Sequence, residues 1–127
     1  MSTYQDLWPE NAPPAEPSLP LGMLKYQAAA LAQKTNQVLN GEVRAVQVVG
    51  KLAYSMDIVA PLLSYRYRIL LISHDVDSVY PITGTFEQES EELPDEASFI
   101  AWLRGVLASD RVNKIINSLL ASSMSVA

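Results

Sequence analysis

Apolar side chains recur with a helical period near both ends of the chain and with a period of two in its middle. Between residues 20 and 40 they fall three and four positions apart, which predicts a helix with one buried stripe. The stripe consists of Leu21, Leu24, Ala28, Leu31, Thr35 and Val38. Gly41 follows where a left-handed helix cap is expected. The small residues at 28–32, AAALA, permit close approach to a sheet or another helix.

Residues 42–86 are predicted to form four β-strands. The segments EVRAVQVV, LAYSMDIVA, YRYRILLIS and VYPITGTF are rich in β-branched and aromatic residues and are separated by short turns. In the second segment, Leu52, Tyr54, Met56 and Ile58 share one face. Short connections between consecutive strands favour an antiparallel meander.

Two further helices are predicted at 95–108 and 110–122, after an acidic loop at 87–94. Phe99, Leu103 and Val106 face inward from the first, and Ser109 or Asp110 caps the second. The order of one helix, four strands and two helices predicts an α+β domain over residues 21–127, with helices packed on an antiparallel sheet.

The strand at 65–73 carries the main candidate for a binding surface. Strict alternation puts Tyr65, Tyr67, Ile69 and Leu71 on one face and Arg66, Arg68, Leu70, Ile72 and His74 on the other. An apolar patch rimmed by arginines is typical of an association surface, whereas a helix or the N-terminal arm would remove it from water. Asp57 of the preceding strand lies within pairing range of Arg66 or Arg68.

The stretch SHDVDSVYP, at 73–81, contains the only histidine, His74, beside Asp75 and Asp77. Asp in a turn hydrogen-bonds nearby backbone N–H groups, so we interpret this stretch as a strand end and expect no metal site there. The chain has no cysteine and no motif of a hydrolase or nucleotide-binding site, which favours a non-enzymatic protein without a cofactor. The alternative is a small hydrolase or anionic-ligand-binding protein that uses Arg66, Arg68 and His74.

Charge is distributed unevenly around a net value of −5. Residues 87–96 hold six acids and no base, which is typical of a solvated loop or of a docking strip for a basic partner. An acidic balance argues against nucleic acid as the partner. No basic and apolar leader pattern occurs at the N-terminus and no apolar run is long enough to span a membrane, so a cytoplasmic location is expected.

Residues 1–20 contain five of the eight prolines and three acids without a base, which predicts an extended arm. The arm also carries Leu7 and Trp8, whose exposure to water is unfavourable. Two interpretations stay open: a disordered tail, or an arm that docks on its own domain or on a neighbouring subunit.

Two stretches, LKYQAAALAQKTNQVLNGEVR (24–44) and DIVAPLLSYRYRILLISHDVDSVYPI (57–82), resemble small bacterial proteins of a family to which no activity is attached. The resemblance covers about half the chain. It implies a bacterial origin and a helix-to-strand junction near Gly41, and it carries no functional residues.

The function expected from the sequence is therefore that of a protein-binding accessory domain, of a regulatory, immunity or chaperone-like kind. Its partner would be another protein or a second copy of the chain, and its binding residues would be Arg66, Arg68, Leu70, Ile72, His74 and Trp8. If a second copy covered His74, association would depend on pH near the ordinary pKa of histidine. The sequence identifies no small-molecule ligand.

Overall fold

The computed structural model describes residues 4–9 and 19–127. The elements of the described chain, in order, are α1 (Leu19–Lys34), β1 (Asn40–Val48), β2 (Lys51–Ala60), the short 3-10 helix η1 (Pro61–Leu63), β3 (Tyr65–Asp75), β4 (Ile82–Phe86), β5 (Glu89–Leu93), α2 (Glu96–Leu107) and α3 (Asp110–Val126). The predicted α+β class is confirmed, but the sheet has five strands where four were expected.

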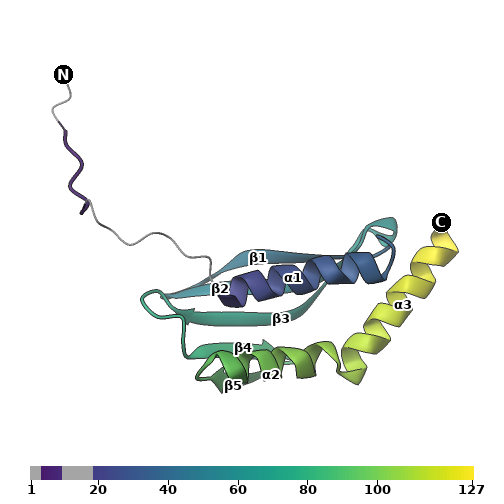
Figure 1. Ribbon diagram of the computed structural model, residues 1–127. Helices are drawn as coiled ribbons and strands as arrows, with labels where there is room; N and C mark the ends of the chain where they lie inside the picture. Colours follow the sequence, from purple (N-terminus) through teal and green to yellow (C-terminus); the bar gives the residue numbers. More distant parts are fainter. Residues whose placement is uncertain (1–3, 10–18) are drawn as a thin grey trace.

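The five strands form an antiparallel meander in the order β1-β2-β3-β4-β5 (Figure 1). The first three strands pair along nearly their whole lengths. β4 is shorter and pairs with β3 only from Leu71 to Ser73. The first half of β3 is therefore unpaired on the side where β4 would continue.

The fifth strand occupies the segment that was predicted as an acidic loop. Glu87 and Gln88 form a two-residue turn with φ of 51° and 69°, and β5 then pairs with β4 from Glu89 to Leu93. A turn of this kind usually contains Asn or Gly, and a strand usually contains β-branched residues. Neither signal is present here, which is why periodicity did not reveal the hairpin.

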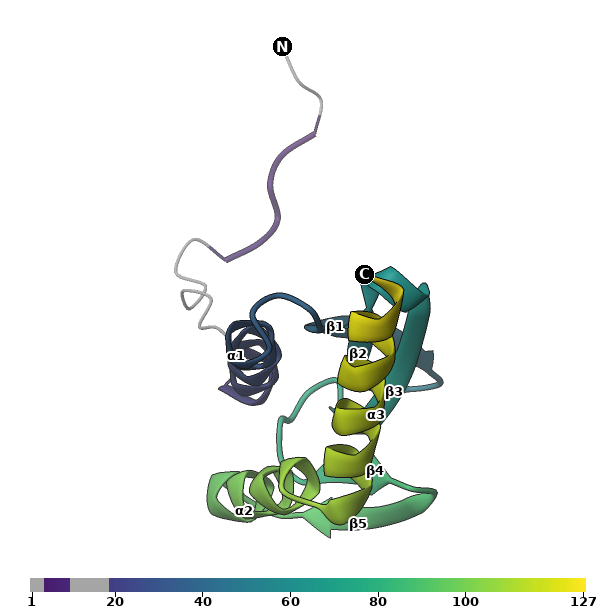
Figure 2. The same ribbon diagram turned by 90° about the vertical axis from the view of Figure 1, so that its right-hand side faces the viewer.

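Both α1 and α2 lie on the same side of the sheet, which we call the covered face (Figure 2). A glycine of the sheet lies against a residue of each helix. A Cβ atom on Gly41 would lie 2.5 Å from the Cα atom of Ala28, and one on Gly84 would lie 2.7 Å from Cζ2 of Trp102. The slim middle of α1 thus permits the close contact that AAALA predicted. The core between helices and sheet includes Leu24, Met56, Ile58, Ile72, Ile82 and Phe99.

The end of α1 differs from the prediction, because the helix stops at Lys34 rather than near residue 40. The Thr35 hydroxyl donates to the Leu31 carbonyl at 2.9 Å and accepts from the Leu39 N–H at 3.1 Å. Asn36 and Gln37 supply the left-handed backbone, with φ of 52° and 68°. Gly41 already belongs to β1, so it permits contact with α1 and does not cap it.

Side chains at their N-termini set the starts of the two C-terminal helices. The Asp95 carboxylate accepts from the Ser98 N–H at 2.9 Å and the Ser98 hydroxyl side chain accepts from the Asp95 N–H at 3.1 Å, so α2 begins with a capping box. Ser109 caps α3, as one of the two predicted candidates. α3 continues to Val126, past the predicted end at 122, and contacts η1 at one end of the sheet (Figure 2).

Candidate functional site

A β-bulge in β3 overturns the predicted shared face of the arginines and His74. Arg68 lies opposite Asp57 and Leu70 lies opposite Met56, so Ile69 is an extra residue in β3. A bulge reverses the alternation of side chains beyond it. Arg66 and Arg68 therefore project from the uncovered side of the sheet, which we call the open face. Leu70, Ile72 and His74 are on the covered face and are buried there.

His74 is a buried structural residue, as the strand-end interpretation expected. Its side chain is 6% exposed, and Nδ1 lies 2.8 Å from the Asp75 carbonyl and 3.2 Å from the Ser78 carbonyl. Because carbonyls only accept, Nδ1 carries the proton and donates to them. Neither the predicted interface role of His74 nor a joint site with Arg66 and Arg68 fits this position.

Residues around His74 have separate partners. Asp75 pairs with Lys51, which lowers the pKa of the Asp75 carboxyl, first through the hydrogen bond and then through the opposite charge. Within residues 4–9 and 19–127, no group of three or more His, Asp or Glu side chains is placed to hold a metal ion.

Asp57 is the most deeply buried acid on the open face, with 0% exposure. Its Oδ2 atom lies 3.0 Å from Nη2 of Arg44 and 3.0 Å from Nη1 of Arg66, and Arg66 also pairs with Glu42. These bonds, that of Asp57 first, raise the pKa of Arg66. The pairing of Asp57 with Arg66 confirms the cross-strand expectation. The network gives Arg66 a structural role, and it does not include Arg68.

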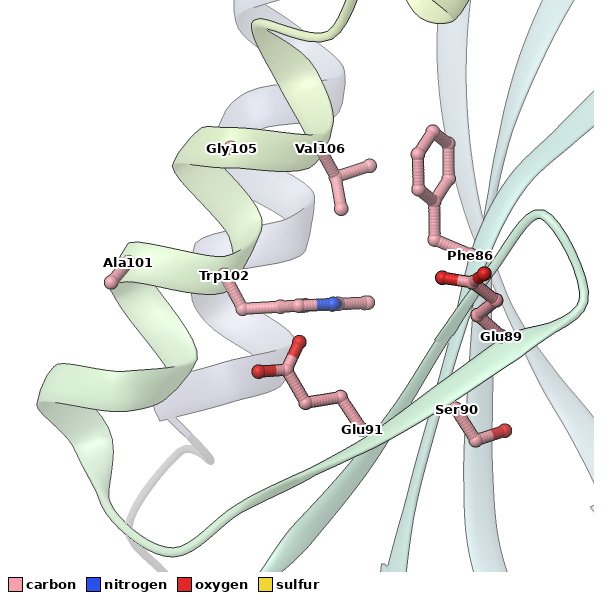
Figure 3. Close-up of a pocket in the computed structure, with 8 residues that line it drawn as sticks. All are labelled: Phe86, Glu89, Ser90, Glu91, Ala101, Trp102, Gly105 and Val106. Atoms are coloured by element: carbon pink, nitrogen blue, oxygen red, sulfur yellow. The ribbon is translucent and has the colours of Figure 1, made fainter.

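A groove lies between α2 and β5, on the acidic side of the molecule (Figure 3). It has a volume of about 490 Å³, and we call it the acidic groove. It is lined by Phe86, Glu89, Ser90, Glu91, Ala101, Trp102, Gly105 and Val106. The indole of Trp102 extends from α2 toward the sheet, with Val106 and Phe86 on one side and the Glu91 carboxylate on the other.

The local sequence explains the acidic groove. Gly84 lies opposite Glu91 in the hairpin, and its missing Cβ makes room for the indole of Trp102. Cross-strand partners share a face, so Glu89 and Glu91 both project toward α2, while Ser90 and Glu92 project from the open face. Asp95 fixes where α2 begins and hence where Trp102 stands.

β5 is an edge strand of the sheet, because it pairs with β4 alone. In an antiparallel ladder every second residue of an edge strand directs its N–H and C=O away from the sheet. These groups lie directly beside the acidic groove. The groove therefore combines an unpaired backbone edge, an aromatic ring and two carboxylates.

Sequence reasoning identified the acids of this region as a possible docking strip but missed Trp102 and Phe86. Trp102 stands beside the inward stripe of Phe99, Leu103 and Val106 and so was not assigned to the core. The spacing of Glu89, Glu91 and Leu93 was the available signal for a strand.

Trp8 does not pack into the folded domain. The side chains of Leu7 and Trp8 are both 83% exposed, so docking on their own domain is not observed. The rest of the predicted arm, residues 1–3 and 10–18, lies outside the described residues.

No family model, no curated protein and no solved structure gives a significant match to this chain. None of the three helices over residues 19–127 combines the length and the apolar character that crossing a membrane requires.

Proposed function

We propose that this chain is a non-enzymatic protein-binding domain that takes an extended, basic segment of a partner protein in the acidic groove. The observation that carries the proposal is the coincidence of the unpaired edge of β5 with Trp102, Glu89 and Glu91. Addition of a peptide strand to a sheet edge is a recurrent mode of recognition, in which the backbone supplies affinity and alternate side chains supply specificity.

The chemistry of the acidic groove favours lysine or arginine in the bound segment. Alternate side chains of a strand added beside β5 would project toward α2, where Glu89 and Glu91 supply opposite charge. A cation over the face of Trp102 gains about 0.5–1 kcal/mol at an exposed site. Both contributions are electrostatic, so binding weakens as salt rises.

An accessory role of the regulatory, immunity or chaperone-like kind is consistent with such binding, because each relies on recognition of a partner and not on catalysis. We also propose a cytoplasmic location, because a chain without cysteine forms no disulfide and needs no oxidising compartment.

Intrinsic fluorescence provides the test. Trp8 and Trp102 are the only tryptophans, so Trp8→Phe leaves Trp102 as the sole reporter. A short peptide of alternating lysine and valine should change the Trp102 emission saturably at low salt. A peptide of alternating glutamate and valine should not. Equal responses to both peptides, or no response to either, would refute the proposal.

Matched variants locate the binding surface on β5. Glu91→Gln removes a carboxylate that lines the acidic groove, whereas Glu92→Gln makes the same change on the neighbouring residue, which projects from the open face. We expect Glu91→Gln to weaken binding of the lysine peptide and Glu92→Gln to weaken it less. The reverse order would assign binding to the open face.

A further inference from the structure

A second groove of opposite charge runs along the unpaired half of β3. One hollow of about 550 Å³ lies beside β3 and reaches the turn between β4 and β5. Another of about 510 Å³ lies between the start of β3 and α3. Tyr67 and Arg111 line both hollows, so the two are adjacent, and we call them together the basic trough.

The basic trough has apolar walls and cationic rims. Tyr65 and Tyr67 of β3 face Ile115 and Leu119 of α3. The cations are Arg68, Arg111 and Lys114. Arg111 pairs with Glu87 at 3.6 Å, while Arg68 and Lys114 form no ion pair with any described residue. The trough thus suits a segment that is extended, acidic and aromatic.

The unpaired backbone of β3 also offers main-chain hydrogen bonds to a segment bound in the basic trough. β4 pairs only with Leu71–Ser73, so residues 65–70 of β3 have no strand partner on that side. On the β2 side all of them except Ile69, the extra residue of the bulge, are paired. A strand of five or so residues could pair with this length. Its alternate side chains would then contact the walls of the basic trough.

This chain carries a segment of that chemistry in its own N-terminal arm. Residues 4–8 read YQDLW, with Asp6 as the charge, and the side chains of Tyr4, Leu7 and Trp8 are 90%, 83% and 83% exposed. Burying large apolar side chains of this kind is favourable. The first twenty residues hold three acids and no base, so the arm and the trough have opposite charges.

The arm leaves the domain far from its own basic trough. α1 begins at Leu19, and its other end, at Lys34 and Thr35, lines a pocket with Asn113 and Ile116 of α3. A helix of 16 residues spans about 24 Å. Figure 1 accordingly shows the start of α1 and the helix α3 at opposite ends of the molecule.

We propose that residues 4–8 of a second copy occupy the basic trough, and that two copies exchange arms reciprocally. Such an exchange is isologous and closes as a two-fold dimer. It assigns Trp8 to an interface in trans and accounts for the exposure of two adjacent large apolar side chains, Leu7 and Trp8.

A charge-swap experiment tests both the contact and its occurrence between copies. Light scattering after size exclusion should give the full chain a concentration-dependent mass that approaches twice its 14.0 kDa. Asp6→Lys and Lys114→Glu should each raise the dimer dissociation constant about tenfold or more. An equimolar mixture of the two variants should recover the dimer, because the reversed arm meets the reversed trough. Asp77→Lys, in an exposed turn, serves as the control and should leave the mass unchanged.

Several results would overturn the proposal. A wild-type chain that stays monomeric at high concentration would do so, as would a mixture that fails to recover the dimer. The variant Trp102→Phe leaves Trp8 as the only tryptophan. If this variant is monomeric and its Trp8 fluorescence is protected from collisional quenching, the arm docks within its own chain. A dimer that survives Asp6→Lys and Trp8→Ala but is lost in Glu89→Lys would mean that β5 of the second copy, and not its arm, occupies the basic trough.

Discussion

The two helices on the covered face approach the sheet in the same way but with different consequences. α1 lies over Gly41 and α2 lies over Gly84, and at both glycines a Cβ atom would come closer than 3.0 Å to the helix. Over Gly41 the nearest atoms include the backbone Cα and O of Ala28, which no rotation can move. Over Gly84 they belong to the indole of Trp102, a side chain that can rotate.

This difference separates a structural contact from one that can take part in binding. The contact of α1 determines where the helix lies, and any change there is transmitted through the backbone. The contact of α2 forms one wall of the acidic groove, where Trp102 can adjust to a ligand without displacing its helix.

Gly41→Ala should be the most destabilising of these substitutions. The added methyl group would meet the backbone of Ala28 at 2.5 Å, so the helix or the strand must shift. Overpacking of a core typically costs 1–3 kcal/mol, and we expect about 3 kcal/mol here because the obstacle is rigid. Urea unfolding followed by circular dichroism measures the change. Gly22→Ala is the control, since nothing lies within 4 Å and alanine favours the helix; equal stability of the two variants would contradict the contact.

Asp57→Asn extends the comparison to the open face, where flexible guanidinium groups cover a buried group. The substitution keeps the shape of the side chain but removes the charge that Arg44 and Arg66 bind. Hydrogen bonds to charged groups contribute about 1.5–3 kcal/mol, and both arginines can turn to water, so we expect a loss of about 2 kcal/mol. Asp77→Asn, in an exposed turn, should change the free energy of unfolding by less than about 0.5 kcal/mol. If Asp57→Asn lost more free energy of unfolding than Gly41→Ala, the network around Asp57, and not the contact of α1 with Gly41, would dominate stability.

Gly84→Ala should cost less than Gly41→Ala and should act on binding. The methyl group would lie 2.7 Å from the indole, and rotation of Trp102 can relieve the contact, so we expect about 1 kcal/mol. The displaced ring would alter the acidic groove and weaken binding of the lysine peptide. Stability and peptide titration on the same preparation separate the two effects. Full peptide affinity in this variant would show that Trp102 does not take part in binding.

Asp95→Asn should have the smallest effect and depends on pH. Hydrogen bonds from Ser98, first from its backbone N–H and then from its side chain, lower the pKa of the Asp95 carboxyl. A lowered pKa stabilises the folded state above the ordinary pKa of Asp, and that contribution is lost as pH falls through the folded value. Asparagine also caps helices, so the variant isolates the charge. The wild type should be more stable than the variant at neutral pH, and the difference should vanish in acid; a difference independent of pH would exclude the charge as its cause.

Short-range patterns predicted the elements well where packing agrees with periodicity. The spacing of Leu21, Leu24 and Ala28 predicted α1, and the alternation of Tyr54, Met56 and Ile58 predicted β2. Failures occurred where one residue changes the geometry without changing the pattern. Ile69 is apolar like its neighbours, so nothing in the alternation shows that it is the extra residue of a bulge.

The candidate site was predictable only in part. The run of acids from Glu87 to Glu96 indicated a surface for a basic partner. The turn at Glu87 and Gln88 adopts a left-handed backbone without the residues that usually signal it, so the strand that presents Glu89 and Glu91 was missed. Trp102 becomes part of the same site because Gly84, distant in sequence, leaves space for its ring.

The amino-acid sequence by itself determined the α+β class, the meander, the three helices and the separation of charge, because these follow from periodicity, turn residues and composition. The tertiary structure alone decided which side chains share a face. Facing depends on the register between strands, and a single bulge in β3 moved His74, Leu70 and Ile72 into the core while it left Arg66 and Arg68 on the open face. The two grooves of opposite charge also depend on strand pairing. Each lies between a helix and an unpaired strand edge, and the pairing of the sheet decides which edges stay unpaired.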